Sequence, residues 1–235
     1  MIERELDWRT RLEADGYCLL PSVLGPDRVR SSLQDWERIC RENAGDPAIL
    51  MGAEGAVSGA RNLLRMWPSV VELARLCPII ELLGPEAGVV RALFFDKPPG
   101  HGWALPWHKD YNIAVRTHGK IGTFSKPTTK AGVPHVEAPV ELLETMVAAR
   151  VHLDDMNDEN GPLRVIPGSH RDRDSRPPVA IHCRLGDVLL MRPLLTHSSA
   201  HCKAACVRHR RIVHLECAPT PHLPDGYEWQ DYVRL

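Results

Sequence analysis

The sequence predicts a mainly β protein, with a double-stranded β-helix core (a jelly roll of the cupin type) and an N-terminal helical cap. Residues 1–88 have mostly helical periodicity. Residues 89–217 instead carry many short apolar or alternating runs between turn signals. The 235 residues, 43% hydrophobic and 25% charged, have an ordinary globular composition, so we expect residues 1–235 to form a single domain.

The N-terminal part is expected to support the sheet rather than to form it. Helices are predicted over residues 6–14, from Pro26 onward, over 69–76 and over 78–83, with a short strand at 17–20. Pro26 suits a first helical turn, where its missing N–H has no partner to lose. Residues 44–60 are rich in Gly and Ala and are expected to form a loop.

The later part is expected to supply the strands of the core. Strands are predicted over residues 89–95, 105–110, 147–154, 163–166, 187–191 and 210–217. Residues 111–144 have little strand signal. A loop of that length in a compact domain is usually a lid or a binding loop, which is our expectation for this segment.

His108 and Asp110, with His197 far downstream, predict a metal site. Two histidines and one carboxylate form the facial triad that holds Fe(II) and leaves coordination positions open. Residues two apart on a strand point to the same side, so His108 and Asp110 can reach one ion while Lys109 points away. The third ligand must come from another strand, which explains the long gap.

Two other sets of residues in the sequence resemble metal sites. His214 and Glu216 form a second ligand-like pair, but no later histidine falls on a strand that could complete it. Cys202 and Cys206, flanked by histidines, have roughly the content of a structural zinc site. A single pair of cysteines lacks the paired spacing of a zinc finger, so free thiols in a loop are the favoured interpretation.

Charge and cysteine content indicate which binding partners and which cellular compartment to expect for this protein. A formal net charge of -1 gives no electrostatic reason to expect nucleic acid or an anionic membrane surface. The first residues are charged and no apolar run could span a bilayer, so neither a signal peptide nor a membrane span is expected. Seven scattered cysteines favour reduced thiols in a cytoplasmic protein.

Several segments between residues 89 and 217 together resemble a known family. They are Phe95–Pro98, Leu105–Asp110, Val151–Asp155, Glu159–Leu163, Ile166–His170, Gly186–Asp187, His197–Ser199 and Arg210–Glu216. The chain resembles the phytanoyl-CoA dioxygenase family of Fe(II)/2-oxoglutarate-dependent oxygenases, in a short bacterial branch. The run from Asn160 through Gly168-Ser169-His170 is its most specific part.

The resemblance implies a function and a ligand set. Members bind Fe(II) through residues matching His108, Asp110 and His197, and use 2-oxoglutarate and O2 as co-substrates. They oxidise a small molecule and release succinate and CO2. Halogenating members have a small residue at the carboxylate position, so Asp110 favours hydroxylation or another oxidation.

The resemblance also implies residues for 2-oxoglutarate. An arginine after the distal histidine grips its far carboxylate, a task suited to the forked guanidinium. Distance along the chain selects Arg208, whereas the motif selects Arg210, which is favoured because loops absorb insertions. Ser199 matches a position that assists the same carboxylate, and Lys97 is a further candidate.

Some alternatives remain open at this point. A cupin-like isomerase or lyase would use the metal without 2-oxoglutarate, and a non-catalytic relative would only bind it. An inward arginine argues against the first, and an intact triad argues against the second. Arg150 is a candidate for a contact with a metal ligand or with the substrate, and Trp103 and Trp107 either line the substrate pocket or pack in the core.

Overall fold

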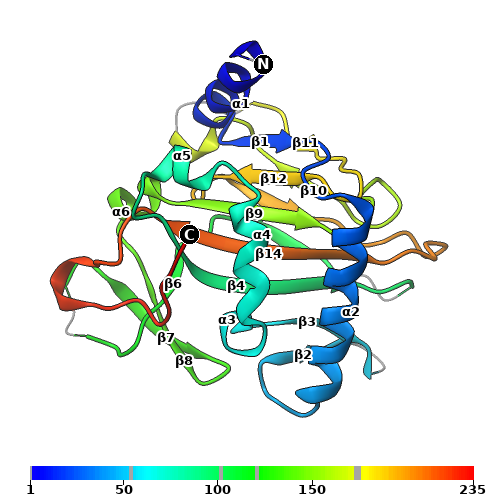
Figure 1. Ribbon diagram of the computed structural model, residues 1–235, viewed down its shortest axis with the longest axis horizontal. Coiled ribbons are helices and arrows are strands. Elements are labelled where there is room, and N and C mark those ends of the chain that lie inside the picture. Colours follow the sequence, from blue (N-terminus) through cyan, green and yellow to red (C-terminus); the bar gives the residue numbers. More distant parts are fainter. Residues whose placement is uncertain (1, 53–54, 101–102, 120–121, 172–175) are drawn as a thin grey trace.

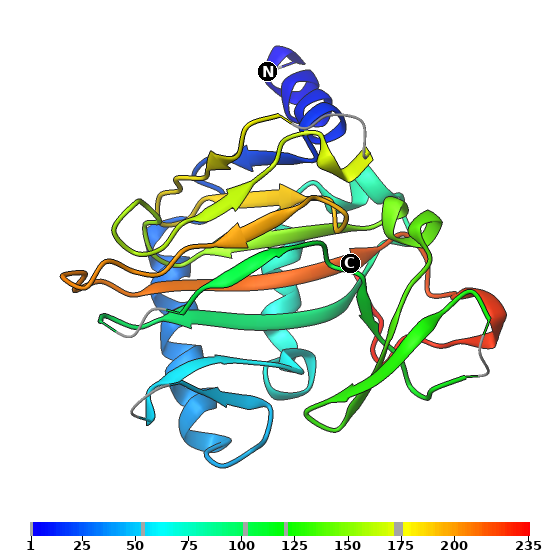
Figure 2. The same cartoon turned by 180° about the vertical axis from the view of Figure 1, so that it is seen from behind.

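The computed structural model describes residues 2–52, 55–100, 103–119, 122–171 and 176–235. Two antiparallel sheets dominate it, with helices on one outer face and a smaller third sheet at one end (Figures 1 and 2). The mainly β class expected from the sequence is confirmed.

The large sheet has the strand order β1-β12-β9-β14-β4-β3-β2, with β15 also paired to β4. These strands are β1 (Tyr17–Leu20), β12 (Val188–Met191), β9 (Val147–His152), β14 (Arg210–Ala218), β4 (Gly88–Lys97), β3 (Val57–Ala60), β2 (Ile49–Met51) and β15 (Val233–Arg234). The long pair β4 and β14 forms its centre, where Arg210 lies opposite Lys97.

The second sheet has the order β11-β10-β13-β5. Its strands are β11 (Val179–Ala180), β10 (Leu163–Val165), β13 (His197–Ser199) and β5 (Leu105–His108). Residues of both sheets line one cavity, so the two sheets face each other. The pairing of β13 with β5 places His197 directly opposite His108.

The N-terminal helices pack on the large sheet: most cover the face opposite the second sheet, and the first lies at the edge formed by β1 (Figure 1). They are α1 (Ile2–Asp15), α2 (Pro26–Glu42), α3 (Leu63–Met66), the 3-10 turn η2 (Pro68–Val70), α4 (Val71–Arg75) and α5 (Ile79–Leu83). Trp36 of α2 stacks on Phe94 of β4 with ring centroids 3.8 Å apart. This contact anchors the helical layer to the central strand.

Alternation along β14 separates the core from the cavity. Val213, Leu215 and Cys217 are fully buried in the cluster shared with the helices. Arg210 and His214 have the opposite parity and line the cavity between the sheets. Because successive side chains of a strand point to opposite faces, one strand builds both the core and the site.

Three expectations about loops and strands are wrong. Residues 44–60 include the paired strands β2 and β3. Residues 111–144 form a third sheet of β6 (Asn112–Ala114), β8 (Val133–Glu137) and β7 (Ser125–Lys130), followed by α6 (Val140–Thr145). The side chains of β7 are nearly all exposed, so it carries no apolar alternation to reveal a strand.

The third error concerns the metal motif. The strand expected over 105–110 ends at His108, and Asp110 lies just beyond it. There the backbone N–H of Asp110 donates a hydrogen bond to the carbonyl of Pro193, at 2.9 Å. The short helix α3 was not predicted either. In the described part of the chain, no helix is both long and apolar enough to cross a bilayer.

Candidate metal centre

His108, Asp110 and His197 converge between the two sheets. Nε2 of His108 lies 3.9 Å from Oδ1 of Asp110, and Nε2 of His197 lies 3.7 Å from Oδ2. One ligand atom from each residue lies within 4.8 Å of the other two, and no other such group of three occurs among the described residues. This spacing suits three ligands around one ion.

Backbone carbonyls orient both imidazoles. Nδ1 of His108 lies 2.7 Å from the carbonyl of Pro106, and Nδ1 of His197 lies 2.8 Å from that of Leu195. A neutral imidazole that donates from Nδ1 to a carbonyl presents the lone pair of Nε2 to a metal. The two Nε2 atoms are the ones that face Asp110.

The protonation states also suit a metal. Burial, only partly offset by Asp110, lowers the pKa of His197 to about 4, so this imidazole is neutral at neutral pH. Burial works to raise the pKa of Asp110, but the neighbouring histidines outweigh it and the pKa is lowered. A neutral imidazole and an ionised carboxylate bind a cation without first losing a proton.

A second group lies around Arg210, on the face of the large sheet that lines the same cavity as the triad. Its guanidinium is fully buried. Nη1 donates to the carbonyl of Gly161 at 3.1 Å, while Nε and Nη2 have no hydrogen-bond partner among the described residues. Burial, with the charge of Arg150, lowers the pKa of Arg210 to about 9, which leaves it charged at neutral pH.

Lys97 and Ser199 complete this group. Nζ of Lys97 donates to Oγ of Ser199 at 2.5 Å, to the carbonyl of Gly161 at 3.2 Å and to the carbonyl of Ala200. Burial, followed by the charge of Arg210, lowers the pKa of Lys97 to about 7. The structure thus brings together Lys97, Ser199 and Arg210, the three residues that the family resemblance implied for 2-oxoglutarate.

The triad and the Arg210 group share one cavity of about 70 Å³. His108, Asp110 and His197 line it together with Ser199 and Arg210. A larger cavity of about 420 Å³ adjoins it and shares His108, Asp110 and Trp103 among its lining residues. A narrow polar chamber therefore continues into a wider space beside the triad.

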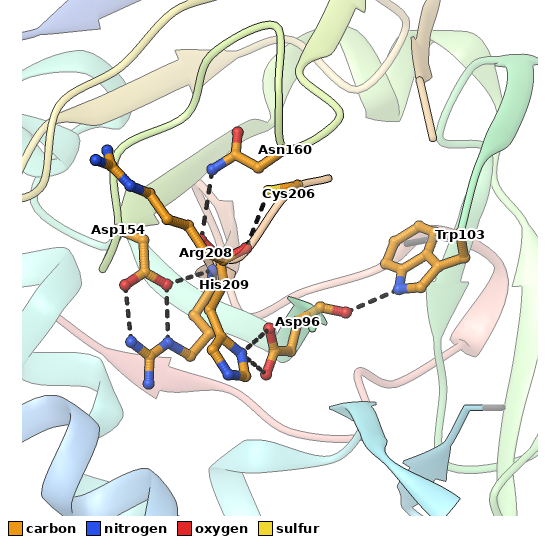
Figure 3. A network of polar contacts seen from close by, with 8 residues as sticks. Asp96, Trp103, Asp154, Asn160, Cys206, Arg208 and His209 are labelled. Carbon is orange, nitrogen blue, oxygen red and sulfur yellow. Dashed lines mark hydrogen bonds and ion pairs between the residues drawn. The ribbon is translucent and has the colours of Figure 1, made fainter. Parts of the chain in front are cut away.

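Trp103 covers Lys97 and Arg210. Nζ of Lys97 lies 4.9 Å from the centre of its ring, and Cζ of Arg210 lies 5.9 Å away. A polar network holds the indole in place: its Nε1 donates to the carbonyl of Asp96 at 2.8 Å, and the Asp96 carboxylate lies 3.0 Å from Nδ1 of His209 (Figure 3).

Arg208 is not part of this group. It precedes β14, its side chain is exposed, and it does not line either cavity. Figure 3 draws its guanidinium on the side of the network away from Trp103. The strand β14 begins only at Arg210, so Arg208 lies outside its alternation of faces.

The competing metal sites do not form in the described residues. Nδ1 of His214 faces Nη1 of Arg150 at 3.3 Å, and its Nε2 lies 3.5 Å from Glu216. His214 is thus part of a chain of polar contacts rather than of a ligand group. Cys202 and Cys206 likewise gather no third ligand. Of the two tryptophans, Trp103 lines the cavity and Trp107 is exposed.

Sequence reasoning missed several charged residues near the metal centre. Arg61, Arg91 and Lys130 line the larger cavity with His108 and Asp110. Arg91 could have been found, because it has the same strand parity as Lys97 on β4. No local sequence pattern marks Arg61 or Lys130, because a contact between distant parts of the chain brings them to the cavity.

The phytanoyl-CoA dioxygenase (PhyH) family matches residues 12–210, which is most of the sequence. The chain belongs to this family. The resemblance seen in the motifs is therefore confirmed, and it extends into the helical cap.

Two curated relatives illustrate the match. L-proline trans-4-hydroxylase of Streptomyces griseoviridis is 30% identical over 167 residues, which cover 70% of this chain and 54% of the relative. Ectoine dioxygenase of Bordetella parapertussis is 28% identical over 173 residues, covering 68% of this chain and 47% of the relative. The chain spans about half the length of these relatives.

Solved structures confirm the double-stranded β-helix. EctD from S. alaskensis with 2-oxoglutarate and 5-hydroxyectoine has a TM-score of 0.68 and 22% identity, over 89% of this chain and 74% of that one. The α-ketoglutarate-dependent carbocyclase SnoK from nogalamycin biosynthesis has a TM-score of 0.66 and 16% identity, over 94% and 88% of the two chains. At these identities the likeness concerns the fold.

Proposed function

We propose that this protein is a non-haem Fe(II)- and 2-oxoglutarate-dependent dioxygenase that hydroxylates or otherwise oxidises a small molecule. Membership of the family supports this activity. One observation carries it: two nitrogens of the buried Arg210 have no partner among the described residues, and Arg210 lines the same cavity as the triad. A buried cation lacking an anionic partner is costly unless a ligand supplies one.

The residues present fit iron and its co-substrate. His108, Asp110 and His197 offer the two nitrogens and one carboxylate that Fe(II) sites of this type use. Arg210 and Ser199 would hold the far carboxylate of 2-oxoglutarate, with Lys97 beside them. A carboxylate can accept two parallel hydrogen bonds from a guanidinium, which matches the two unpartnered nitrogens of Arg210.

The division of work follows from this fit. Iron, 2-oxoglutarate and O2, when bound, supply the oxidising power, and succinate and CO2 leave as products. The protein chain positions the iron and the co-substrate. Its three ligands keep the iron between the sheets, and Arg210 fixes the orientation of the co-substrate. Trp103 and the sheet walls limit water around the buried cations.

The presence of Asp110 supports oxidation without halogen transfer. Halogenating members of the family have a small residue at the matching position, whereas Asp110 supplies a candidate metal ligand there. An isomerase or lyase of the same fold would have no use for an unpartnered guanidinium facing the metal, and a protein that only binds metal would not need one either. We therefore propose neither alternative.

We also propose that residues 1–235 act as one oxygenase unit in the cytoplasm. The buried apolar cluster joins α2, the short helices and both central strands, which supports a single unit. All seven cysteines are free, which supports a reducing compartment. The proposed substrate class is a small molecule, as for the enzymes named proline hydroxylase and ectoine dioxygenase.

Anaerobic titration tests the proposal. Addition of Fe(II) and then 2-oxoglutarate should produce the weak visible charge-transfer band of the chelate, and admission of O2 should release succinate slowly even without substrate. The Arg210→Gln protein should need far more 2-oxoglutarate for the same band. Absence of the band in the wild-type protein with iron bound would refute the use of 2-oxoglutarate.

A further inference from the structure

The larger cavity beside the triad has a strongly one-sided charge. Its volume of about 420 Å³ lies within the range of pockets that enclose small ligands. The cations that line it are Arg61, Arg91, Lys109 and Lys130. Among the described lining residues the only carboxylate is Asp110, which is already assigned to the metal. The cavity therefore carries an excess of positive charge.

Two of these cations have no partner within the described chain. Neither the guanidinium of Arg61 nor the ammonium of Lys130 makes a hydrogen bond or an ion pair with a described residue, although both are half-buried. Lys109 differs, because its Nζ donates to the carbonyl of Ser169 at 3.0 Å. A half-buried cation without a partner loses hydration and gains nothing in return, unless a ligand supplies an anion.

A specific contact brings the two cations to the same place. Nδ2 of Asn62 donates to the carbonyl of Ala131 at 3.2 Å. Asn62 directly follows Arg61, and Ala131 directly follows Lys130 at the tip of the β7–β8 hairpin. The hairpin is therefore fixed against the end of β3, and the two like charges are held together.

Arg91 adds a third positive charge to this cluster. Its Nη1 donates to the carbonyl of Asn112 at 2.9 Å and lies 3.4 Å from Glu216, while its buried Nε finds no partner in the described part of the chain. Glu216 is the nearby acid that offsets it, and Glu216 also faces His214 at 3.5 Å. One carboxylate cannot balance Arg61, Arg91 and Lys130.

The neighbouring groups respond as expected for a positive region. Burial lowers the pKa of Lys130, and the charges of Arg91 and Arg61 lower it further. Burial is also the main reason that the pKa of His135 falls to about 4, with Arg91 and Lys130 contributing. These shifts agree with the geometry, in which cations crowd one wall of the cavity.

This cluster lies apart from the residues proposed for 2-oxoglutarate. Arg91 and Lys97 are on the same face of β4, six residues apart, which corresponds to roughly 20 Å along a strand. Leu93 and Phe95 lie between them and face the cavity. One strand thus carries a cation at each end and an apolar surface between.

We propose that Arg61, Arg91 and Lys130 bind the carboxylate or phosphate group of an anionic substrate, whose hydrocarbon part lies on Leu93 and Phe95 beside the metal centre. The inference rests on the proposed function, since it names the class of molecule that the oxygenase accepts. It assigns specificity to three residues outside the iron and 2-oxoglutarate groups. The three cations could bind a carboxylate or a phosphate group in the same way, so the test includes a probe with each group.

Binding of matched probes tests the charge preference without relying on turnover. The probes are hexanoate, hexyl phosphate, hexanamide and hexylamine, titrated by calorimetry into protein loaded with Mn(II) and 2-oxoglutarate. We expect one or both anions to bind at least about tenfold more tightly than the amide and the amine. Equal binding of all four probes, or no measurable binding of either anion, would overturn the inference.

Single substitutions then locate the preference. Arg61→Gln and Lys130→Gln should each weaken binding of the preferred anion by about fivefold or more and leave hexanamide unchanged. The matched controls are Arg65→Gln and Lys126→Gln, whose side chains are 59% and 73% exposed and paired with Asp46 and Glu137. Anion binding that is unaltered in Arg61→Gln and Lys130→Gln would contradict the assignment.

A separate readout distinguishes the two proposals. The charge-transfer band of Fe(II) and 2-oxoglutarate should form normally in the Arg61→Gln and Lys130→Gln proteins, because neither residue belongs to the metal or Arg210 group. If the band forms but no anion preference exists, the substrate inference alone fails. If the band does not form even in the wild-type protein, the proposed function fails.

Discussion

Arg210 on β14 lies directly opposite Lys97 on β4, so two buried cations share one end of the chamber. Both donate to the same carbonyl, that of Gly161. No described carboxylate pairs with either side chain. When Lys97 is protonated, its charge and that of Arg210 repel each other at this buried position. A bound carboxylate would relieve this repulsion, and that is the physical basis for the predictions about 2-oxoglutarate.

The first prediction concerns Arg210. Replacing it with Gln should weaken 2-oxoglutarate binding by about 1.5–3 kcal/mol, because a charged hydrogen-bond donor is lost. This corresponds to a dissociation constant raised roughly tenfold to 150-fold, measured from the anaerobic charge-transfer band. The matched control is Arg208→Gln, which removes an exposed guanidinium close by. A larger effect in the control would reverse the assignment.

The second prediction concerns the metal ligands. His108→Ala, Asp110→Ala and His197→Ala should each lower the Fe(II) content of protein reconstituted without oxygen, while the circular dichroism spectrum stays that of the wild type. The cause is the loss of one of three ligands. His182→Ala is the control, because His182 is exposed and pairs with Asp158. Full iron occupancy in any one of the three variants would remove that residue from the centre.

A third prediction links Lys97 to pH. The folded protein holds the pKa of Lys97 at about 7, against an ordinary value of 10.5, mainly through burial. Between these pH values the unfolded chain binds a proton that the folded chain does not, so the free energy of unfolding rises with pH. The slope from this group is at most about 1.4 kcal/mol per pH unit.

The comparison is with Lys97→Met, which keeps the length of the side chain and removes the titrating group. Urea unfolding from pH 7 to pH 9 should show the wild-type protein gaining stability relative to this variant. The exposed Lys126→Met should follow the wild type in parallel. Parallel curves for Lys97→Met and the wild type would show that Lys97 keeps an ordinary pKa.

The fourth prediction concerns Gly161, whose φ is +70°. An added Cβ would lie 2.4 Å from the carbonyl oxygen of Ala200 and 2.9 Å from Nζ of Lys97. Gly226 has nearly the same φ, +71°, with nothing within 4 Å. Gly226→Ala should therefore cost only the left-handed backbone strain, about 1–2 kcal/mol.

Gly161→Ala should cost more than Gly226→Ala, because it adds a clash to the same strain. It should also weaken 2-oxoglutarate binding, since the carbonyl of Gly161 positions Arg210 and Lys97. Urea unfolding and the charge-transfer titration measure the two effects. Equal losses of stability in the two variants would contradict the predicted clash, because the backbone around Ala200 would then have moved to make room for the methyl group.

Sequence reasoning succeeded where local pattern and structure coincide. His108 and His197 sit at strand ends and meet through one strand pair, so spacing and motif were enough to identify them. It found Asp110 as a member of the same group but placed it on the wrong element, because a hydrogen bond to Pro193 rather than a continued strand sets its position. Arg61 and Lys130 could not be assigned to one cavity from their spacing. The contact that brings them together, between Asn62 and Ala131, joins residues that are 69 positions apart in the sequence.

The polar strands were missed for a related reason. β7 and β8 are stabilised by pairing with each other and by a small separate apolar cluster, while their outer faces remain polar. Strand prediction depends on alternating burial, which such a hairpin hardly shows. The register of β14 with β4, by contrast, is constrained by an apolar face, because a one-residue shift would turn that face towards the cavity.

The strands β6, β8 and β7 pair with one another and, within the described chain, with neither of the two large sheets. Insertions or exchanges in these strands can therefore reshape the larger cavity, which Asn112 and Lys130 line, while His108, Asp110 and His197 keep their places. Changes in one peripheral hairpin thus give evolution, or an engineer, a way to alter the shape of this cavity.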